Sequence, residues 1–310
     1  MSYIFKMDLS VIIINSSTED YLRACLRSVF TTVKGLDFEV IVVDNASNDG
    51  SMAMMKVEFP HIRRIENYEN RGFAVAGNQG FRVMKGRYAL LLHADTVLTE
   101  GAVRELFMFM DEHPEAVIAC GQLLDADGTK QTSFERFPAF SALLMDRSPK
   151  EPLFSPRRPD PGGASPLPIE VDACAGACLI VRKSAIDGVG GLDERYGYHY
   201  AIMDWARTMK RAGGIRYCVP VARIHHHRGR SRRGGIRYRM QEFRSRYLYI
   251  MKWESSVYFT LAAVVIVIRL ILRWVFTGAG VALSLGLNRP LRDTWAVNTK
   301  LLAWHLPGCP

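Results

Sequence analysis

Short apolar runs that end abruptly in polar residues recur along the first two thirds of the chain. Runs of consecutive aliphatic residues without polar alternation are typical of parallel strands that are buried on both faces. Between them, apolar residues recur at helical spacing, most clearly over residues 18–30 and 100–113. The pattern predicts a mostly parallel α/β sheet flanked by helices, with right-handed crossovers. Strands are predicted at residues 9–14, 39–43, 62–65, 88–92, 117–120, 177–181 and 217–220.

The stretch YALLLHADT at residues 88–96 combines a buried strand with candidate chemistry. Its apolar residues stop at His93, and Asp95 follows at the carboxyl end of the strand. In open α/β sheets this edge is where ligands bind, because the loops there converge while helices cover the faces. An alternative is that Asp95 closes a turn or caps the helix that starts near Glu100.

Two other predicted strands also end in polar residues, at Asn15 and Asp44. A nucleotide site uses such positions well, because one carboxylate can accept hydrogen bonds from a base or ribose while another holds a divalent cation. A dehydrogenase-type dinucleotide site needs G-x-G-x-x-G after the first strand, but the chain has NSSTED there. Within that segment, Thr18 is expected to cap the following helix.

The last third of the chain differs in kind. Residues 257–268 carry no charge, whereas Arg269 and Arg273 interrupt the following apolar residues and lie one helical turn apart. A membrane-spanning helix needs about 20 apolar residues, and an arginine near its centre costs about 2.5–3.5 kcal/mol. An amphipathic helix in the membrane plane avoids this cost, because its arginines reach the lipid headgroups. A buried helix hairpin or a dimer interface is the alternative.

The net charge of +9 and the pI near 9.3 would suit nucleic acid, an anionic membrane or a phosphate-rich substrate. Arginines gather in residues 223–246, directly before the apolar segment, which favours the membrane surface over nucleic acid. The first residues do not resemble a signal peptide, so the cytoplasmic face is expected. The proline-rich stretch 147–168 predicts an exposed loop or a boundary. The six cysteines are scattered and are expected to be ordinary buried thiols.

The loops described above resemble those of family 2 glycosyltransferases with the GT-A fold, especially their rhamnosyltransferase-like branch. The matching segments, in order between residues 9 and 231, are LSVIIINSST, EVIVVDNASNDGS, ENRGFAVAGNQGF, GRYALLLHADTVL, SFERFPAF, VDACAGACLIVRKSAIDGVGGLDERY and the surroundings of HHHRGRS. The resemblance implies a GT-A domain at residues 1–235. Residues 236–310 are then the basic, apolar helical tail that the charge and hydropathy pattern predicts to associate with the membrane.

The same resemblance implies an inverting transfer of a sugar from a nucleotide diphosphate, with Mg²⁺ or Mn²⁺ as the cofactor. The donor is expected to be linked to dTDP or UDP, with rhamnose from dTDP as the first choice. The acceptor is expected to be a lipid-linked molecule or a polysaccharide of the bacterial cell envelope. The oligomeric state stays open, with a homo-oligomer among the options.

The resemblance also assigns roles to individual residues. Asp44 matches the acidic residue that reads the base, and Asp95 matches the last acid of the D-x-D-type metal motif, whose first position here is His93. His226, with His227 as the other register, matches a histidine that assists the metal or diphosphate; a solvated loop is the alternative. The donor-binding residues expected are Asn15, Asp44, Asn45, Asp49, Asn78 and Asp95, and the metal ligands are Asp95 and His226.

Two departures from the family pattern stand out. After the first strand the family carries Asn-Tyr-Asn, whereas this chain has NSS, without the aromatic residue. The family's Glu-Asp pair, whose second member takes the acceptor's proton, is Ala201-Ile202 here.

Two explanations of the missing base stay open. In the first, another side chain substitutes for it, and the candidates are Asp204, His199 and Asp193. Asp204, however, lies about 200° round the helix from Ile202. In the second, the chain keeps the scaffold and donor binding and works as a binding or scaffolding partner of an active enzyme.

Overall fold

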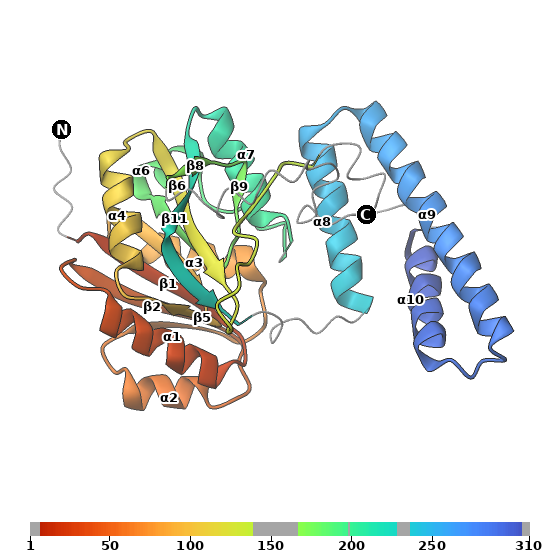
Figure 1. The fold of residues 1–310 in the computed structure, drawn as a ribbon, viewed down its shortest axis with the longest axis horizontal. Coiled ribbons are helices and arrows are strands. Elements are labelled where there is room, and N and C mark those ends of the chain that lie inside the picture. Colours follow the sequence, from red (N-terminus) through yellow and green to blue (C-terminus); the bar gives the residue numbers. More distant parts are fainter. Residues whose placement is uncertain (1–6, 139–166, 198, 228–235, 306–310) are drawn as a thin grey trace. The chain divides into compact units, whose positions relative to one another are not determined.

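A nine-stranded mixed sheet forms the centre of the N-terminal part of the computed structural model, which describes residues 7–138, 167–197, 199–227 and 236–305 (Figure 1). Strands β1 to β4 are parallel, β10 runs antiparallel to both of its neighbours, and β6 and β11 are again parallel. In spatial order the sheet contains β3 (Arg63–Asn67), β2 (Phe38–Asn45), β1 (Leu9–Asn15), β4 (Tyr88–His93), β10 (Cys178–Arg182), β6 (Ala116–Leu124), β11 (Ile215–His226) and β5 (Thr96–Leu98), with β8 (Ile169–Glu170) on β11.

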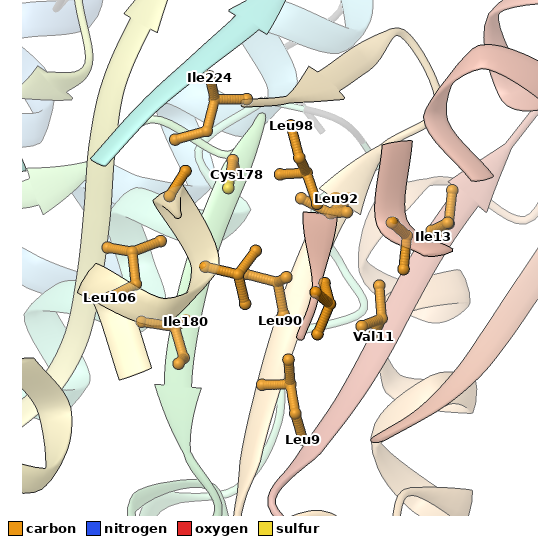
Figure 2. Packing of buried hydrophobic residues seen from close by; sticks show 14 of the residues in the cluster. Leu9, Val11, Ile13, Leu90, Leu92, Leu98, Leu106, Cys178, Ile180 and Ile224 are labelled. Carbon is orange, nitrogen blue, oxygen red and sulfur yellow. The ribbon is translucent and has the colours of Figure 1, made fainter. Parts of the chain in front are cut away.

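Helices cover both faces of this sheet. The helices α1 (Glu19–Thr32), α2 (Ser51–Glu58) and α4 (Ala102–Glu112) pack on the face that carries Leu9, Val11 and Ile13, and part of this core is shown in Figure 2. The other face carries α3 (Phe73–Val83) and α7 (Ala201–Arg211), and a short helix α6 (Lys183–Val189) precedes α7. The two-layered helical cover and the mostly parallel sheet confirm the predicted fold class.

Close contact between α3 and the sheet depends on a glycine. A Cβ atom added at Gly80 would collide with the side chain of Ile12 on β1. On its other side, α3 packs against α7, where the rings of Phe81 and Trp205 stack with their centroids 5.4 Å apart. A second, two-stranded sheet pairs β7 (Phe134–Glu135) with β9 (Ala173–Cys174) beside this layer.

Strand β11 is much longer than the sequence predicted. It runs over Ile215–His226, whereas the prediction covered only residues 217–220. Proline lacks the N–H group that a central strand uses. The structure accommodates Pro220 with a register irregularity between Val219 and Arg223 against β6. The strand then continues and pairs with β5, which the sequence pattern did not indicate.

The predicted cap of the first helix was also wrong in detail. Thr18 occupies the N-cap position of α1, but its hydroxyl makes no capping bond and donates to Asn15 Oδ1 at 2.7 Å. The backbone N–H of Glu19 donates instead to Asp49 Oδ2 at 2.9 Å. A carboxylate from a distant loop therefore stabilises the start of α1.

Five cysteines, Cys25, Cys120, Cys174, Cys178 and Cys218, are buried and free of disulfides, in agreement with the prediction of ordinary thiols. Burial raises the pKa of Cys25 to about 12, which keeps its thiol protonated and unreactive. Cys309 and most of the proline-rich stretch at 147–168 lie outside the described residues.

Arg216 supports a stability prediction. Its side chain is 2% exposed, and its guanidinium donates to the carbonyl oxygens of Asp172, Gly214 and Val171 at 3.2, 2.8 and 3.0 Å. Replacing Arg216 with alanine would leave these oxygens without their donors, so we expect the free energy of unfolding to fall by about 2–4 kcal/mol. Urea denaturation measures this loss. Arg223→Ala, at an exposed position of the same strand, is the control; equal losses in both variants would contradict the prediction.

The C-terminal part forms a separate compact unit with three described helices. These are α8 (Ile236–Trp253), α9 (Ser256–Leu283) and α10 (Arg289–His305). They share a small core made of Phe243, Tyr247, Ile266, Leu270 and Leu301. Helix α9 is long and apolar enough to cross a membrane by length and composition.

Helix α9 presents a second apolar face to the outside. Side chains between 45% and 72% exposed recur along it at a spacing of three or four residues, which places them on one side of the helix. They are Val257, Leu261, Val264, Ile268, Ile271, Leu272, Val275 and Phe276. The buried residues Ala262, Ile266 and Leu270 point away from this apolar stripe and into the small core.

Candidate functional site

The turn between β4 and β5 presents two candidate ligands at the carboxyl end of the central strand. His93 ends β4, Asp95 lies in the turn, and Thr96 begins β5. The hydroxyl of Thr96 donates to the His93 carbonyl at 2.7 Å, which closes the turn. The His93 N–H donates to the Ala177 carbonyl at 2.9 Å and ties this edge to the start of β10. His93 and Asp95 are thereby held on the same side of the sheet edge.

The extension of β11 brings a third ligand to the same place. His226 pairs with Thr96 across the β5–β11 ladder, and the N–H of His227 donates to the Asp95 carbonyl at 2.9 Å. His226 Nε2 lies 3.5 Å from Asp95 Oδ1, and His93 Nδ1 lies 4.0 Å from the same oxygen. One ligand atom from each of the three residues falls within a group no wider than 4.8 Å. Of the two histidines that the sequence left open, the structure places His226 against Asp95.

The cluster suits a divalent cation. Asp95 and His226 are 6% and 9% exposed. Burial by itself would raise the pKa of the Asp95 carboxyl, but the neighbouring imidazoles of His226 and His93 hold that pKa below its ordinary value. The carboxylate is therefore ionised at neutral pH. Two imidazoles and one carboxylate are a donor set that binds ions such as Mn²⁺, and further coordination positions would stay available to a substrate.

A second polar cluster lies where β1 and β2 end side by side. Asn15 Nδ2 donates to Asp44 Oδ1 at 2.8 Å and to Ser47 Oγ at 3.0 Å. Ser47 donates to Asp44 twice, from its N–H at 3.0 Å and from its hydroxyl at 2.6 Å. Asp44 is 1% exposed, so it shapes this loop from inside. A carboxylate accepts about four hydrogen bonds, which leaves it about one for a ligand.

Three other residues expected to bind the donor make hydrogen bonds within the protein that stabilise its loops and helix ends. Asn45 accepts from the N–H of Arg71 at 2.9 Å and donates to Asn70 Oδ1 at 3.0 Å, which ties the loop after β3 to β2. Asp49 accepts from the N–H groups at the starts of α1 and α2. Asn78 exchanges two 2.8 Å hydrogen bonds with the backbone of Leu192. Their contribution to a donor site stays a prediction.

The position that corresponds to the missing base lies beside the metal cluster. A Cβ atom added at Gly176 would stand 3.2 Å from Ile202 Cγ1 and 3.9 Å from His93 Nε2. Ile202 and His93 therefore flank the same small glycine. Ala201, in contrast, is fully buried. An aliphatic side chain faces the place where a proton acceptor would be useful.

The three proposed substitutes for the base lie elsewhere. Asp204 is 2% exposed, and its Oδ1 accepts a hydrogen bond from the Tyr196 hydroxyl at 3.2 Å. Asp193 forms an ion pair with Arg195 at 2.6 Å. His199 is half-buried just before α7. The cluster of His93, Asp95 and His226 includes none of these three.

His93 is a candidate ligand that the sequence reasoning missed. That reasoning treated His93 only as the residue in place of a lost acid. The sequence did contain a signal for this role. Imidazole is the commonest metal ligand in proteins, and His93 stands two residues before the acidic candidate Asp95. Only the pairing of β5 with β11 shows that three ligand atoms gather there.

Comparisons with known proteins agree on the fold and on the type of protein. Residues 10–190 match the sequence profile described as "Glycosyl transferase family 2". The chain is 26% identical over 239 residues to N-acetylglucosaminyl-diphospho-decaprenol L-rhamnosyltransferase of Mycobacterium tuberculosis (strain CDC 1551 / Oshkosh), covering 72% of this chain and 77% of the relative. It is 23% identical over 251 residues to the low-salt glycan biosynthesis hexosyltransferase Agl10 of Haloferax volcanii, covering 78% and 75%.

Among solved structures, the crystal structure of GalNAc-T7 with UDP, GalNAc and Mn²⁺ superposes with a TM-score of 0.59 at 14% identity. The similarity covers 79% of this chain but only 48% of that one, so the chain spans about half of this structural neighbour. At this level of identity the likeness concerns the fold alone.

Proposed function

The chain belongs to glycosyl transferase family 2, and from that premise we propose that it uses a divalent cation to transfer a sugar from a nucleotide-diphosphate donor to an acceptor hydroxyl. The observation that carries the proposal is the cluster of His93, Asp95 and His226 at the carboxyl end of β4. These three side chains would hold the cation. A cation bound there would neutralise the charge that develops on the diphosphate leaving group.

In this proposal the donor would bind to residues at the ends of neighbouring strands. Because β4, β1 and β2 are adjacent and parallel, the Asp95 turn and the Asn15–Asp44 cluster share one edge of the sheet. This edge is the usual ligand site in such sheets. The diphosphate would lie at Asp95, and the nucleoside would lie toward the Asp44 loop. This arrangement accounts for the residues that the structure gathers there.

The relatives' names suggest the substrates. One relative is an L-rhamnosyltransferase whose name specifies a diphospho-decaprenol acceptor. We propose rhamnose linked to dTDP, with a UDP-linked sugar as the alternative. The acceptor would be lipid-linked or a growing glycan of the bacterial cell envelope. Transfer would proceed with inversion at the sugar.

The donor set favours Mn²⁺ over Mg²⁺ as the cation. Mg²⁺ prefers oxygen ligands and usually keeps several waters, whereas imidazole suits transition-metal ions. Two of the three ligands here are imidazoles, because His93 stands two residues before Asp95 in place of a carboxylate.

The absent base separates two functional hypotheses. Ile202 cannot accept a proton, so a transferase with this site would turn over slowly in the chain's present form. The alternative is a protein that keeps donor binding and acts as a binding or scaffolding partner. Both hypotheses require an intact donor site, and they differ in the transfer step.

We further propose that the C-terminal unit binds the cytoplasmic face of the membrane through α9 lying in the membrane plane. Arg269 and Arg273 are about 100° and 140° round the helix from Ile268, in the middle of the exposed apolar stripe, so they lie at the edge of the stripe beside Phe276. The stripe itself carries no charge, so it can enter the acyl region while the arginines stay at headgroup level. This arrangement favours an in-plane helix over a spanning one.

Ile268→Glu should weaken membrane binding at least tenfold. The change removes about 2 kcal/mol of apolar transfer from the middle of the stripe and adds a charge. Co-sedimentation with vesicles of anionic phospholipid measures the effect. Thr294→Glu, which adds the same charge at an exposed position of α10, is the control. Unchanged vesicle binding by the Ile268 variant, together with loss of a dimer in light scattering, would favour a dimer interface instead.

The proposed function is tested by calorimetric titration of the detergent-solubilised protein with dTDP and with UDP, each with and without Mn²⁺. Metal-dependent binding of either nucleotide is the expected result. If neither binds and no common nucleotide sugar is hydrolysed or transferred, the proposal loses its foundation.

A further inference from the structure

A buried glutamine, Gln131, holds one of the candidate ligands from behind. Gln131 lies just before β7 and is 5% exposed. Its Nε2 donates to the carbonyl oxygen of His226 and to Asp125 Oδ1, both at 2.6 Å, and lies 3.4 Å from the Leu124 carbonyl. Its Oε1 lies 2.9 Å from His226 Nδ1. Gln131 thus contacts both the backbone and the ring of His226.

These contacts determine which end of the amide faces the ring. The three oxygen atoms described around Nε2, from His226, Asp125 and Leu124, only accept hydrogen bonds, so they must face the NH₂ group. The amide oxygen is then the atom opposite His226 Nδ1. Since an amide oxygen only accepts, Nδ1 must carry the hydrogen.

The consequence appears at the other nitrogen of the same ring. When Nδ1 carries the hydrogen of a neutral imidazole, Nε2 has a free lone pair. His226 Nε2 faces Asp95 Oδ1 at 3.5 Å, so two electron-rich atoms point at one space. A cation between them would be bound by both atoms. The arrangement is the one in which an outer hydrogen bond fixes the tautomer of a metal-binding histidine.

Gln131 is itself held rigidly. Its N–H donates to the Leu123 carbonyl at 2.8 Å, and its carbonyl accepts from Gln122 Nε2 at 2.9 Å. Gln122 is also buried but donates to Leu123, Gln131 and Ser133 rather than to His226. Of these two buried glutamines, Gln131 contacts the backbone and the ring of His226, whereas the described hydrogen bonds of Gln122 go to other residues.

We propose that Gln131 is a positioning residue that keeps His226 in the Nδ1–H tautomer and so presents Nε2 to the metal. The inference rests on the proposed function in one respect, namely that the cluster binds a divalent cation. Gln131 would act on the metal site through His226, without contacting the ion itself.

The first test follows the tautomer without metal. Long-range ¹H–¹⁵N NMR spectra distinguish an imidazole protonated at Nδ1 from one protonated at Nε2, and a His226→Asn variant identifies the signals of His226. We expect the Nδ1–H form in the native protein, and its loss in Gln131→Leu. Gln122→Leu should keep it. An Nε2–H form in the native protein would overturn the proposal.

The second test measures affinity for Mn²⁺ alone, from the electron paramagnetic resonance signal of the free ion. We expect binding to weaken about 10- to 100-fold in Gln131→Leu, as is typical when the outer partner of a metal-binding histidine is lost. Gln122→Leu, a similar loss of a buried amide, should leave the affinity unchanged.

The two tests separate the possible failures. Equal weakening in both glutamine variants would reduce Gln131 to a structural role and overturn the proposal. If the native protein fails to bind Mn²⁺, the metal-dependent function fails, while the tautomer measurement still decides whether Gln131 sets the state of His226.

Discussion

Asp95→Asn is expected to abolish metal-dependent binding of dTDP or UDP, with a loss of affinity of about 100-fold or more. The asparagine keeps the shape of the side chain but removes the charge. Asp95 Oδ1 is the atom that lies nearest to both histidines, at 3.5 and 4.0 Å, so it is the centre of the donor set. Without it, the two imidazoles would be the remaining protein ligands of the cation.

Calorimetric titration with each nucleotide, in the presence and absence of Mn²⁺, measures the effect. Asp187→Asn is a suitable control, because it removes a carboxylate from the surface of α6, where its partner is Lys183. Native-like, metal-dependent binding by the Asp95 variant would place the cation elsewhere. Metal-dependent binding in the native protein that disappears only in the Asp95 variant would establish a working donor site.

Ile202→Asp is expected to raise the rate of sugar transfer by about 10²- to 10⁴-fold, the usual contribution of a well-placed general base. Ile202 is partly exposed and flanks Gly176 together with His93, so a carboxylate there would stand next to the donor cluster. Ala201 is fully buried, and a glutamate at that position would have no room. Ile202→Asp alone is therefore a better test than replacing both Ala201 and Ile202, because it restores the carboxylate without disturbing the buried position.

The rate of nucleoside diphosphate release from nucleotide sugars, with and without an acceptor, measures the gain. Ile202→Asn is the matched control, because it has nearly the same size as aspartate but cannot take a proton at neutral pH. A gain in the aspartate variant alone would show that the remaining site is intact. No gain, in a protein that still binds the donor, would favour the scaffolding hypothesis.

The proposed metal ligands and the position proposed for the base are held by different parts of the fold. His93, Asp95 and His226 lie in or next to strands, and backbone hydrogen bonds of β4, β5 and β11 hold them. Ile202 lies in the first turn of α7, where a change of side chain leaves the sheet unaltered. A chain could therefore lose its proton acceptor without losing its donor site. Both proposed functions require the donor site, and they differ in whether sugar transfer takes place.

The sequence by itself determined most of the longer strands, most helices of the N-terminal part and the edge of the sheet at which the candidate ligands gather. These depend on local patterns: the apolar run of residues 88–92 must be buried, and Asp95, three residues after it ends, must then lie at the strand's carboxyl end. Asn15 and Asp44 were placed by the same reasoning. The family resemblance added the nature of the ligands, and the register of the histidines stayed open.

Tertiary structure alone decided which residues meet. The pairing of β5 with the far end of β11 selected His226 over His227, and it depends on a strand that continues past Pro220. Gln131 reaches His226 only because both lie beside the end of β6, and Asp49 caps α1 from a distant loop. Local patterns report whether a side chain is buried or exposed, but strand register and long-range hydrogen bonds arise from the free energy of the whole packed chain. The functional cluster consists of contacts of that second kind.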